Sequence, residues 1–257
     1  MSGEPSNRSN GNKAEVGPTL FVQACAQMMS AAWIRHQIHT TSTAPGHNIS
    51  GIAYAMRYTF ATQIGFAFEL ALKSVEQGLS ETEDGQGPQV SEGHDLEILW
   101  NALPCPVRKQ IDEGAESLGR QWFPHADDSK ALLPLGEWLK KHQEFLRHAK
   151  RRYAIKGDQW RSEHRFVTNL FLSFKEGENG IDGLYCLIAY WAAIMSLALG
   201  LRWEAKRCEA NADLAADREE AKNLLDRAVE QMRDGPVPYV APLMIQRGGE
   251  SRFRPFA

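Results

Sequence analysis

The chain has 257 residues, of which 43% are hydrophobic, and its formal net charge at pH 7 is -3. This length and apolar content are sufficient for one large domain with a full hydrophobic core. The slightly acidic balance excludes a protein that coats nucleic acid with its whole surface, so any nucleic-acid surface would be a local patch.

Residues 1–18 are polar and rich in Ser, Asn and Gly. This composition predicts a disordered lead-in and lacks the apolar core of a signal peptide. The four cysteines lie far apart in the sequence, so we expect a reducing, cytoplasmic setting. From there helical periodicity dominates, and no strand-like alternation persists for more than a few residues. Helices are predicted, in chain order, over residues 21–38, 52–75, 94–103, 107–118 and 132–153. The segment 160–175 is compatible with either a helix or a pair of strands.

The most apolar segment, Leu184 to Leu201, has eighteen residues without a charge. Its length reaches the lower limit for a membrane span. Basic residues flank both of its ends, so they indicate no orientation in a membrane. We therefore favour a core helix buried on all sides of a helical bundle, with a membrane span as the alternative.

The segment from Glu204 to Asp234 is charged, with nine acidic and six basic residues. Between Leu214 and Met232 it carries a narrow apolar stripe, typical of a solvated helix that docks on one side or of a helix that recruits a partner protein. The expected organisation is a disordered segment (1–18), a helical domain (19–203), a charged C-terminal helix (204–235) and an extended tail (236–257).

Two short motifs flank an acidic, Gly-rich loop: FELALK, with Glu69 and Lys73, and GHDLEILW, with His94 and Asp95. Glu69 and Lys73 are four residues apart with the acid first, the spacing of an ion pair on a helix face. Asp95 is placed to cap the second helix or to occupy its first turn. His94 could then bond to Glu69 across the helix pair. We interpret the four residues as a polar clasp between two helices, which could lie at the edge of a binding cleft. The alternative is a polar functional site assembled from the two helices.

The pairing of FELALK with GHDLEILWNALP resembles the second and third helices of HEPN domains (higher eukaryotes and prokaryotes nucleotide-binding), and RRYAIKG resembles a segment of many HEPN-like bacterial proteins. The resemblance covers about residues 50–200. It implies an all-α helical bundle, often a homodimer. Many members are metal-independent RNases in toxin, CRISPR or antiphage systems, and others have kept only a binding function.

The resemblance also implies a catalytic signature, an Arg followed four to six residues later by a His. The cation would stabilise the phosphate and the imidazole would move the proton of the attacking 2′-hydroxyl. Arg120 and His125, in RQWFPH, have this spacing. However, Pro124 directly precedes the His, and the segment is predicted to be a connector. Catalysis therefore stays undecided.

A basic segment follows, residues 140–165, with nine basic residues against three acidic ones and interleaved aromatic rings. Bases can stack on such rings while the cations hold phosphates. The alternative is a solvated helix face whose aromatic residues point into the core. The candidate nucleic-acid-binding residues are Arg147, Lys150, Arg151, Arg152, Tyr153, Arg161 and Arg165.

Other chemistry is not indicated. His36 and His39 share a helix face, but no further ligand completes a metal set, and the four cysteines form no C-x-x-C pair. The sequence has no P-loop, no dinucleotide-binding glycine motif and no nucleophile elbow. We therefore predict neither a metal nor a cofactor.

The sequence thus predicts an all-α, HEPN-like protein with long helices and a charged C-terminal helix. The expected function is binding of RNA or a nucleotide, or regulation of a partner, in a bacterial defence or toxin setting. The alternatives are a diverged RNase of the same fold and a helical interaction module acting through Leu214 to Met232.

Overall fold

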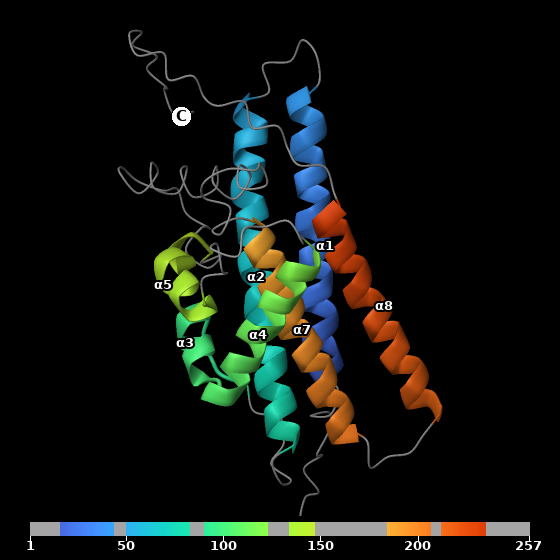
Figure 1. Cartoon of the computed structure of the whole chain (residues 1–257). Helices are drawn as coiled ribbons and strands as arrows, with labels where there is room; N and C mark the ends of the chain where they lie inside the picture. The colour runs from blue at the N-terminus through green and yellow to red at the C-terminus, as the bar shows by residue number, and fades with distance from the viewer. Residues whose placement is uncertain are drawn as a thin grey trace, which may run out of the picture.

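The computed structural model describes residues 16–43, 50–82, 90–122, 134–146, 184–206 and 212–234. These residues are almost entirely helical and include no strand, which confirms the predicted all-α class. Figure 1 shows the arrangement. The helices are α1 (Val16–Thr43), α2 (Ser50–Thr82), α3 (Leu96–Ala102), α4 (Cys105–Trp122), α5 (Leu135–Leu146), α7 (Leu184–Lys206) and α8 (Ala212–Asp234).

The two longest helices, α1 and α2, run antiparallel and pack against each other along most of their length (Figure 1). Helix α7 packs against α2 and is crossed by α4, while α8 lies against α1 and α7. The short helices α3 and α5 contact each other and α2. The bundle therefore has four long helices, α1, α2, α7 and α8, with α3, α4 and α5 packed around α2 and α7.

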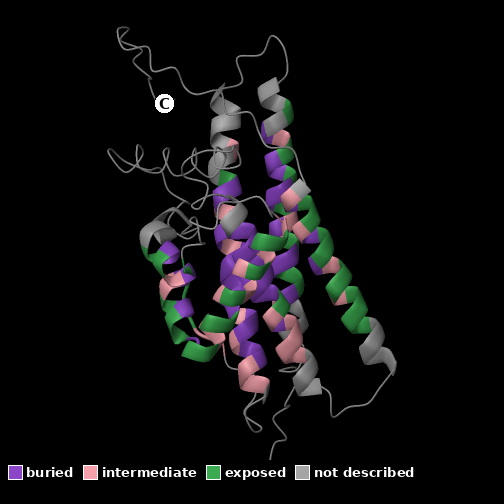
Figure 2. Ribbon diagram, viewed as in Figure 1, coloured by how far each residue is buried: buried purple, intermediate pink, exposed green. Residues whose placement is uncertain are grey.

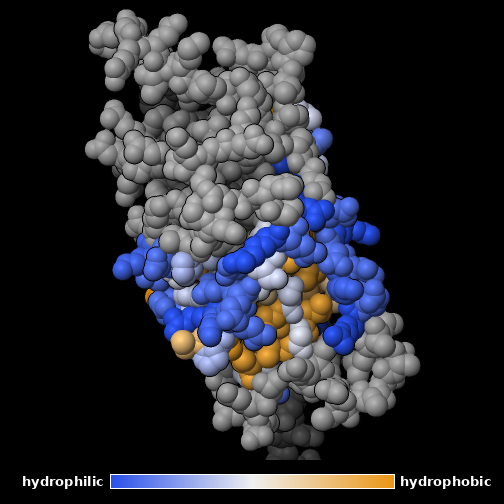
Figure 3. Space-filling model, in the orientation of Figure 1, coloured by the Kyte–Doolittle hydropathy of each residue, from blue (hydrophilic) through white to orange (hydrophobic). Residues whose placement is uncertain are grey.

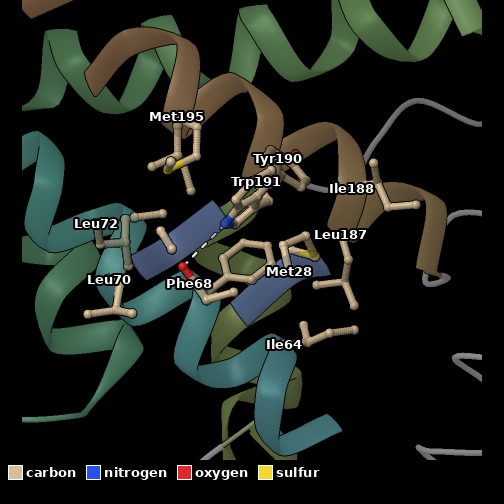
Figure 4. Close-up of a cluster of buried hydrophobic side chains, with 14 of the residues drawn as sticks. Met28, Ile64, Phe68, Leu70, Leu72, Leu187, Ile188, Tyr190, Trp191 and Met195 are labelled. Carbon is tan, nitrogen blue, oxygen red and sulfur yellow. Dashed lines mark hydrogen bonds between the residues drawn. The ribbon is translucent and has the colours of Figure 1, made fainter. Parts of the chain in front are cut away.

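Helix α7 is the core helix of the bundle, as its composition predicts. Every residue from Leu187 to Met195 is buried, and Figure 4 shows several of them packed against Ile64 and Phe68 of α2 and Met28 of α1. The indole Nε1 of Trp191 donates a hydrogen bond to the Ala67 carbonyl, 3.2 Å away. Within the described parts of the chain, no helix combines the length and apolar character needed to cross a membrane.

Helix α8 docks on the bundle through its apolar stripe. Leu225, Ala228 and Met232 are buried, while the opposite side of the helix is exposed and charged (Figure 2). Of the two interpretations of this helix, docking on one side is the one observed. Helix α8 packs against α1 and α7, so it belongs to the same bundle as the preceding helices. Recruitment of a partner through Leu214 to Met232 stays a prediction.

The predicted helices all occur, with shifted ends. Helix α1 begins at Val16, inside the predicted lead-in, and α4 extends to Trp122, past the predicted end at residue 118. Residues 1–15, the ambiguous segment 160–175 and the predicted tail lie outside the described residues. On the face seen in Figure 3, the described surface is mostly hydrophilic around one hydrophobic patch.

A glycine permits the close approach of α2 to α7. A Cβ on Gly78 would lie 2.9 Å from Cβ of Leu201, whereas a Cβ on Gly200 of α7 would meet nothing within 4 Å. Alanine at a helical glycine position normally stabilises by about 0.5–1 kcal/mol. We expect Gly200→Ala to show that gain, and Gly78→Ala instead to lower the free energy of unfolding by about 1–3 kcal/mol, because α2 and α7 must separate.

Urea unfolding of the two variants, followed by circular dichroism, measures this difference. Both changes add the same methyl group to a helix, so helix propensity cancels in the comparison. Equal stabilisation by the two substitutions would show that α2 and α7 do not approach as closely as described.

Candidate functional site

The candidate site lies where α2 meets the start of α3. The segment that enters α3 is fixed to α2 by Ser91, whose amide and hydroxyl both donate to the Glu76 carboxylate, at 2.9 Å and 2.8 Å. Gly93 follows with φ = 117°, a backbone conformation that favours glycine. These two features place His94 directly over α2.

Asp95 caps α3, as predicted. Its backbone is extended, with φ = -90° and ψ = 110°, and its side chain accepts from the amides of Glu97 and Ile98 at 3.1 Å and 3.3 Å. These bonds satisfy two of the amides that have no partner within the helix. Asp95 therefore has a structural role at the helix start and orients the chain that carries His94.

Glu69 is the centre of the polar cluster. Its carboxylate accepts from Nζ of Lys73 at 2.9 Å, and Nδ1 of His94 lies 2.9 Å and 3.1 Å from its two oxygens. The Glu69 side chain is 3% exposed, that of Lys73 is 13% exposed and that of His94 is 59% exposed. The hydrogen bond expected between His94 and Glu69 is thus present, and it links α2 to the entry of α3.

This geometry determines which nitrogen of His94 carries the proton. A carboxylate can only accept, so Nδ1 must donate to Glu69, and in the neutral ring the basic lone pair is then on Nε2. The cluster can therefore hold two helices together and can also present an oriented imidazole for proton transfer at the protein surface.

Arg120 and His94 lie on different elements: Arg120 is on α4, and His94 precedes α3. Arg120 is exposed in the last turn of α4, and its Nη2 lies 2.5 Å from Oε1 of Glu116 on the same helix face. The predicted connector therefore begins later than expected, since RQW is helical. His125 lies outside the described residues, so the pairing of Arg120 with His125 stays a prediction.

Most of the basic segment, residues 140–165, also lies outside the residues that the structure describes. Lys140 is exposed on α5, which ends at Leu146. All of the candidate nucleic-acid-binding residues lie outside the described residues; they are Arg147, Lys150, Arg151, Arg152, Tyr153, Arg161 and Arg165. Their role stays a prediction.

Arg35 is a buried polar residue that the sequence analysis missed. It is fully buried on α1, and its Nη1 donates to the carbonyl oxygen of Met232. Met232 is in the last turn of α8, where carbonyl groups have no partner within the helix, and a cation is favoured there by the helix dipole. Burial lowers the pKa of Arg35 to about 10, so it stays charged at neutral pH. Its position on the buried side of α1, in register with Met28 and Ala32, was a signal that could have found it.

Asp112 of α4, like Arg35, forms a hydrogen bond to the backbone of another helix. Its Oδ1 accepts from the amide of Leu135, the first residue of that helix, at 3.0 Å. Burial raises the pKa of Asp112, while the hydrogen bond from Leu135 and the charge of Arg108 act in the opposite direction. Asp112 thus joins α4 to the start of α5.

A shallow pocket of about 20 Å³, enough for a single water molecule, lies between α1, α2 and α7. Phe21 and Ala198 form apolar parts of its lining, and Gln77, Glu81 and Arg202 are polar. Nε2 of Gln77 donates to Oε1 of Glu81 at 2.8 Å. Burial lowers the pKa of Arg202, and the nearby carboxylates of Glu81 and Asp217 oppose that shift. These polar groups are thus already engaged with one another, and the pocket is shallow.

Among the described residues, no three His, Cys, Asp or Glu side chains are grouped closely enough to hold a metal ion. His36 is exposed on α1, and the side chain of His39 is not among those that the structure describes. Comparison of the chain with protein-family models, curated protein sequences and solved structures finds no match.

Proposed function

We propose that this chain is a HEPN-like helical protein of the bacterial cytoplasm that binds RNA or a nucleotide. The observation that carries the proposal is the hydrogen bond between Glu69 and His94, at 2.9 Å. It joins the two motifs on which the resemblance rests, FELALK on α2 and GHDLEILW at the start of α3. A defence or toxin setting and a homodimeric assembly belong to the same proposal.

The ligand-binding part of the proposal comes from charge. The chain as a whole is slightly acidic, but residues 140–165 have nine basic residues against three acidic ones. Such a local excess attracts phosphates, and the aromatic residues within it offer surfaces on which bases can stack. A single-stranded RNA is the ligand that uses both features.

Binding of a fluorescently labelled single-stranded RNA to the full chain, measured by anisotropy at several salt concentrations, tests the proposal. The double variant Arg151→Gln, Arg152→Gln is expected to bind several-fold more weakly and to lower the salt dependence by about two counterions. The matched control is Arg218→Gln, Arg227→Gln, which removes the same charge from the exposed side of α8.

The control variant should bind RNA as the parent does. Absence of binding by the parent chain at low salt would refute the proposal. Equal weakening by the two double variants would show that the charge of the whole molecule, and not the basic segment, determines binding.

The second candidate is a metal-independent RNase of the same fold, which the exposed imidazole of His94 favours. The anisotropy samples, analysed on a denaturing gel, distinguish it from binding alone. Cleavage that is lost in His94→Ala would assign the proton transfer to His94 and Glu69. Cleavage lost in His125→Ala would assign it to Arg120 and His125, and intact RNA would leave binding as the function.

A further inference from the structure

Helix α8 lies against the bundle at its end and diverges from it at its start. Among its described side chains the buried ones are Leu225, Ala228 and Met232, all in its second half. Residues 217–220, nearer its start, are all exposed. In Figure 1 the start of α8 lies apart from the other helices, whereas its end lies beside α1 and the end of α4. The described contacts thus attach α8 mainly through its second half.

Two arginines hold the last turn of α8. Nη1 of Arg35, on α1, donates to the carbonyl oxygen of Met232. The guanidinium carbon of Arg233 lies 5.8 Å from the ring centroid of Trp122, the last residue of α4, which is a cation–π distance. One arginine comes from α1 and the other contacts α4, so the last turn of α8 joins α1 to the end of α4.

The rest of the bundle is closed without α8. Helix α7 packs against α2 and α4, α1 packs against α2, and α2 also contacts α3 and α5. An element with few buried apolar side chains opens at a lower free energy than the core around it. Opening of α8 would also return Arg35 to water, and this hydration would offset part of the lost hydrogen bond. Opening of α8 alone is therefore the least costly way to detach one of the four long helices.

We propose that α8 leaves the bundle as one unit while α1, α2, α4 and α7 stay packed, and that the last turn of α4 loosens with it. The half-buried side chain of Trp122 packs against the core and against Arg233, and it loses the second contact when α8 opens. Arg120 lies in the same turn of α4, so the position of α8 determines how firmly Arg120 is held. This inference does not depend on RNA binding.

Hydrogen exchange of the full chain, followed by mass spectrometry of peptides at several low urea concentrations, tests the proposal. Peptides from α8 and from the last turn of α4 should share one opening free energy. That free energy should lie below the value for peptides from α2 and from the buried part of α7. An opening free energy of α8 equal to that of α2 would overturn the proposal.

The variant Ile64→Val separates opening of α8 from unfolding of the whole bundle. Ile64 is fully buried on α2, in a cluster built from α1, α2 and α7 (Figure 4). A state in which only α8 has opened keeps this cluster. We therefore expect several-fold faster exchange in α2 and α7 and unchanged exchange in α8 and the end of α4. Equal acceleration in α8 would show that α8 opens only when the whole bundle unfolds, and would refute the proposal.

The variant Arg35→Met tests the coupling between α8 and α4. It removes the donor to the Met232 carbonyl, so exchange in α8 and in the last turn of α4 should both become about tenfold faster. The matched control is Arg218→Gln, on the exposed side of α8, which should change neither. Faster exchange in α8 with an unchanged end of α4 would contradict coupling through Arg233 and Trp122.

Discussion

Replacing Arg35 with alanine is expected to lower the free energy of unfolding by about 3–5 kcal/mol. The variant leaves a cavity in the core and removes the donor to the Met232 carbonyl, and buried large-to-small changes and lost charged hydrogen bonds each cost about 2–3 kcal/mol or more. Arg35→Met fills most of the volume without burying a charge, so it should cost about 1–2 kcal/mol. Urea unfolding followed by circular dichroism gives these values.

The control for this prediction is Arg218→Ala, on the exposed side of α8, where we expect a change within about 0.5 kcal/mol. Hydrogen exchange adds a local readout: Arg35→Ala should reduce the protection of amides in α8 more than of those in α2, since Arg35 holds the end of α8. Equal stability of Arg35→Ala and Arg218→Ala would show that Arg35 does not join α1 to α8.

The second large effect is expected at Glu69. Glu69→Ala should lower the free energy of unfolding by about 2–4 kcal/mol, because it deprives both Lys73 and His94 of their acceptor and leaves a mostly buried ammonium group without it. Glu69→Gln keeps an acceptor oxygen in the same place and should cost about 1 kcal/mol. The same unfolding experiment measures both variants.

A surface ion pair of the same spacing provides the control. Glu116 and Arg120 are also four residues apart, but both side chains are largely exposed, so Glu116→Ala should cost no more than about 0.5 kcal/mol. A double-mutant cycle of Glu69→Ala with His94→Ala isolates the bond between α2 and the entry of α3. If the two changes are additive, that bond does not stabilise the fold, and the clasp interpretation is wrong.

Much of the fold was predictable because the helices carry local signals. Leu184 to Leu201 has no charge on any side, and the structure buries most of it against four other helices. The stripe that includes Leu225, Ala228 and Met232 likewise predicted a helix with one docking side. Helix ends were predicted less well: α1 begins at Val16, and α4 extends to Trp122, whose side chain packs against the core.

The candidate site was predictable in part. The spacing of Glu69 and Lys73 and the capping role of Asp95 follow from helix geometry within a few residues, so sequence reasoning could find them. His94 and Glu69 are 25 residues apart in the sequence. Their hydrogen bond could be expected from the sequence, but it forms only because α2 packs against the start of α3. The register of Arg35 with Met28 and Ala32 could have indicated that Arg35 is buried, but not its partner, because that partner is a backbone carbonyl 197 residues away.

Local chemistry therefore determines the helices of this protein, their apolar sides and their caps, since these depend on residues three or four positions apart. Tertiary structure decides which apolar side meets which. It covers the described stripe of α8 with α1 and α7, and it leaves Trp33 exposed on α1. The reason is physical: both helices present apolar side chains, and only the placement of the neighbouring helices determines which of these surfaces is removed from water.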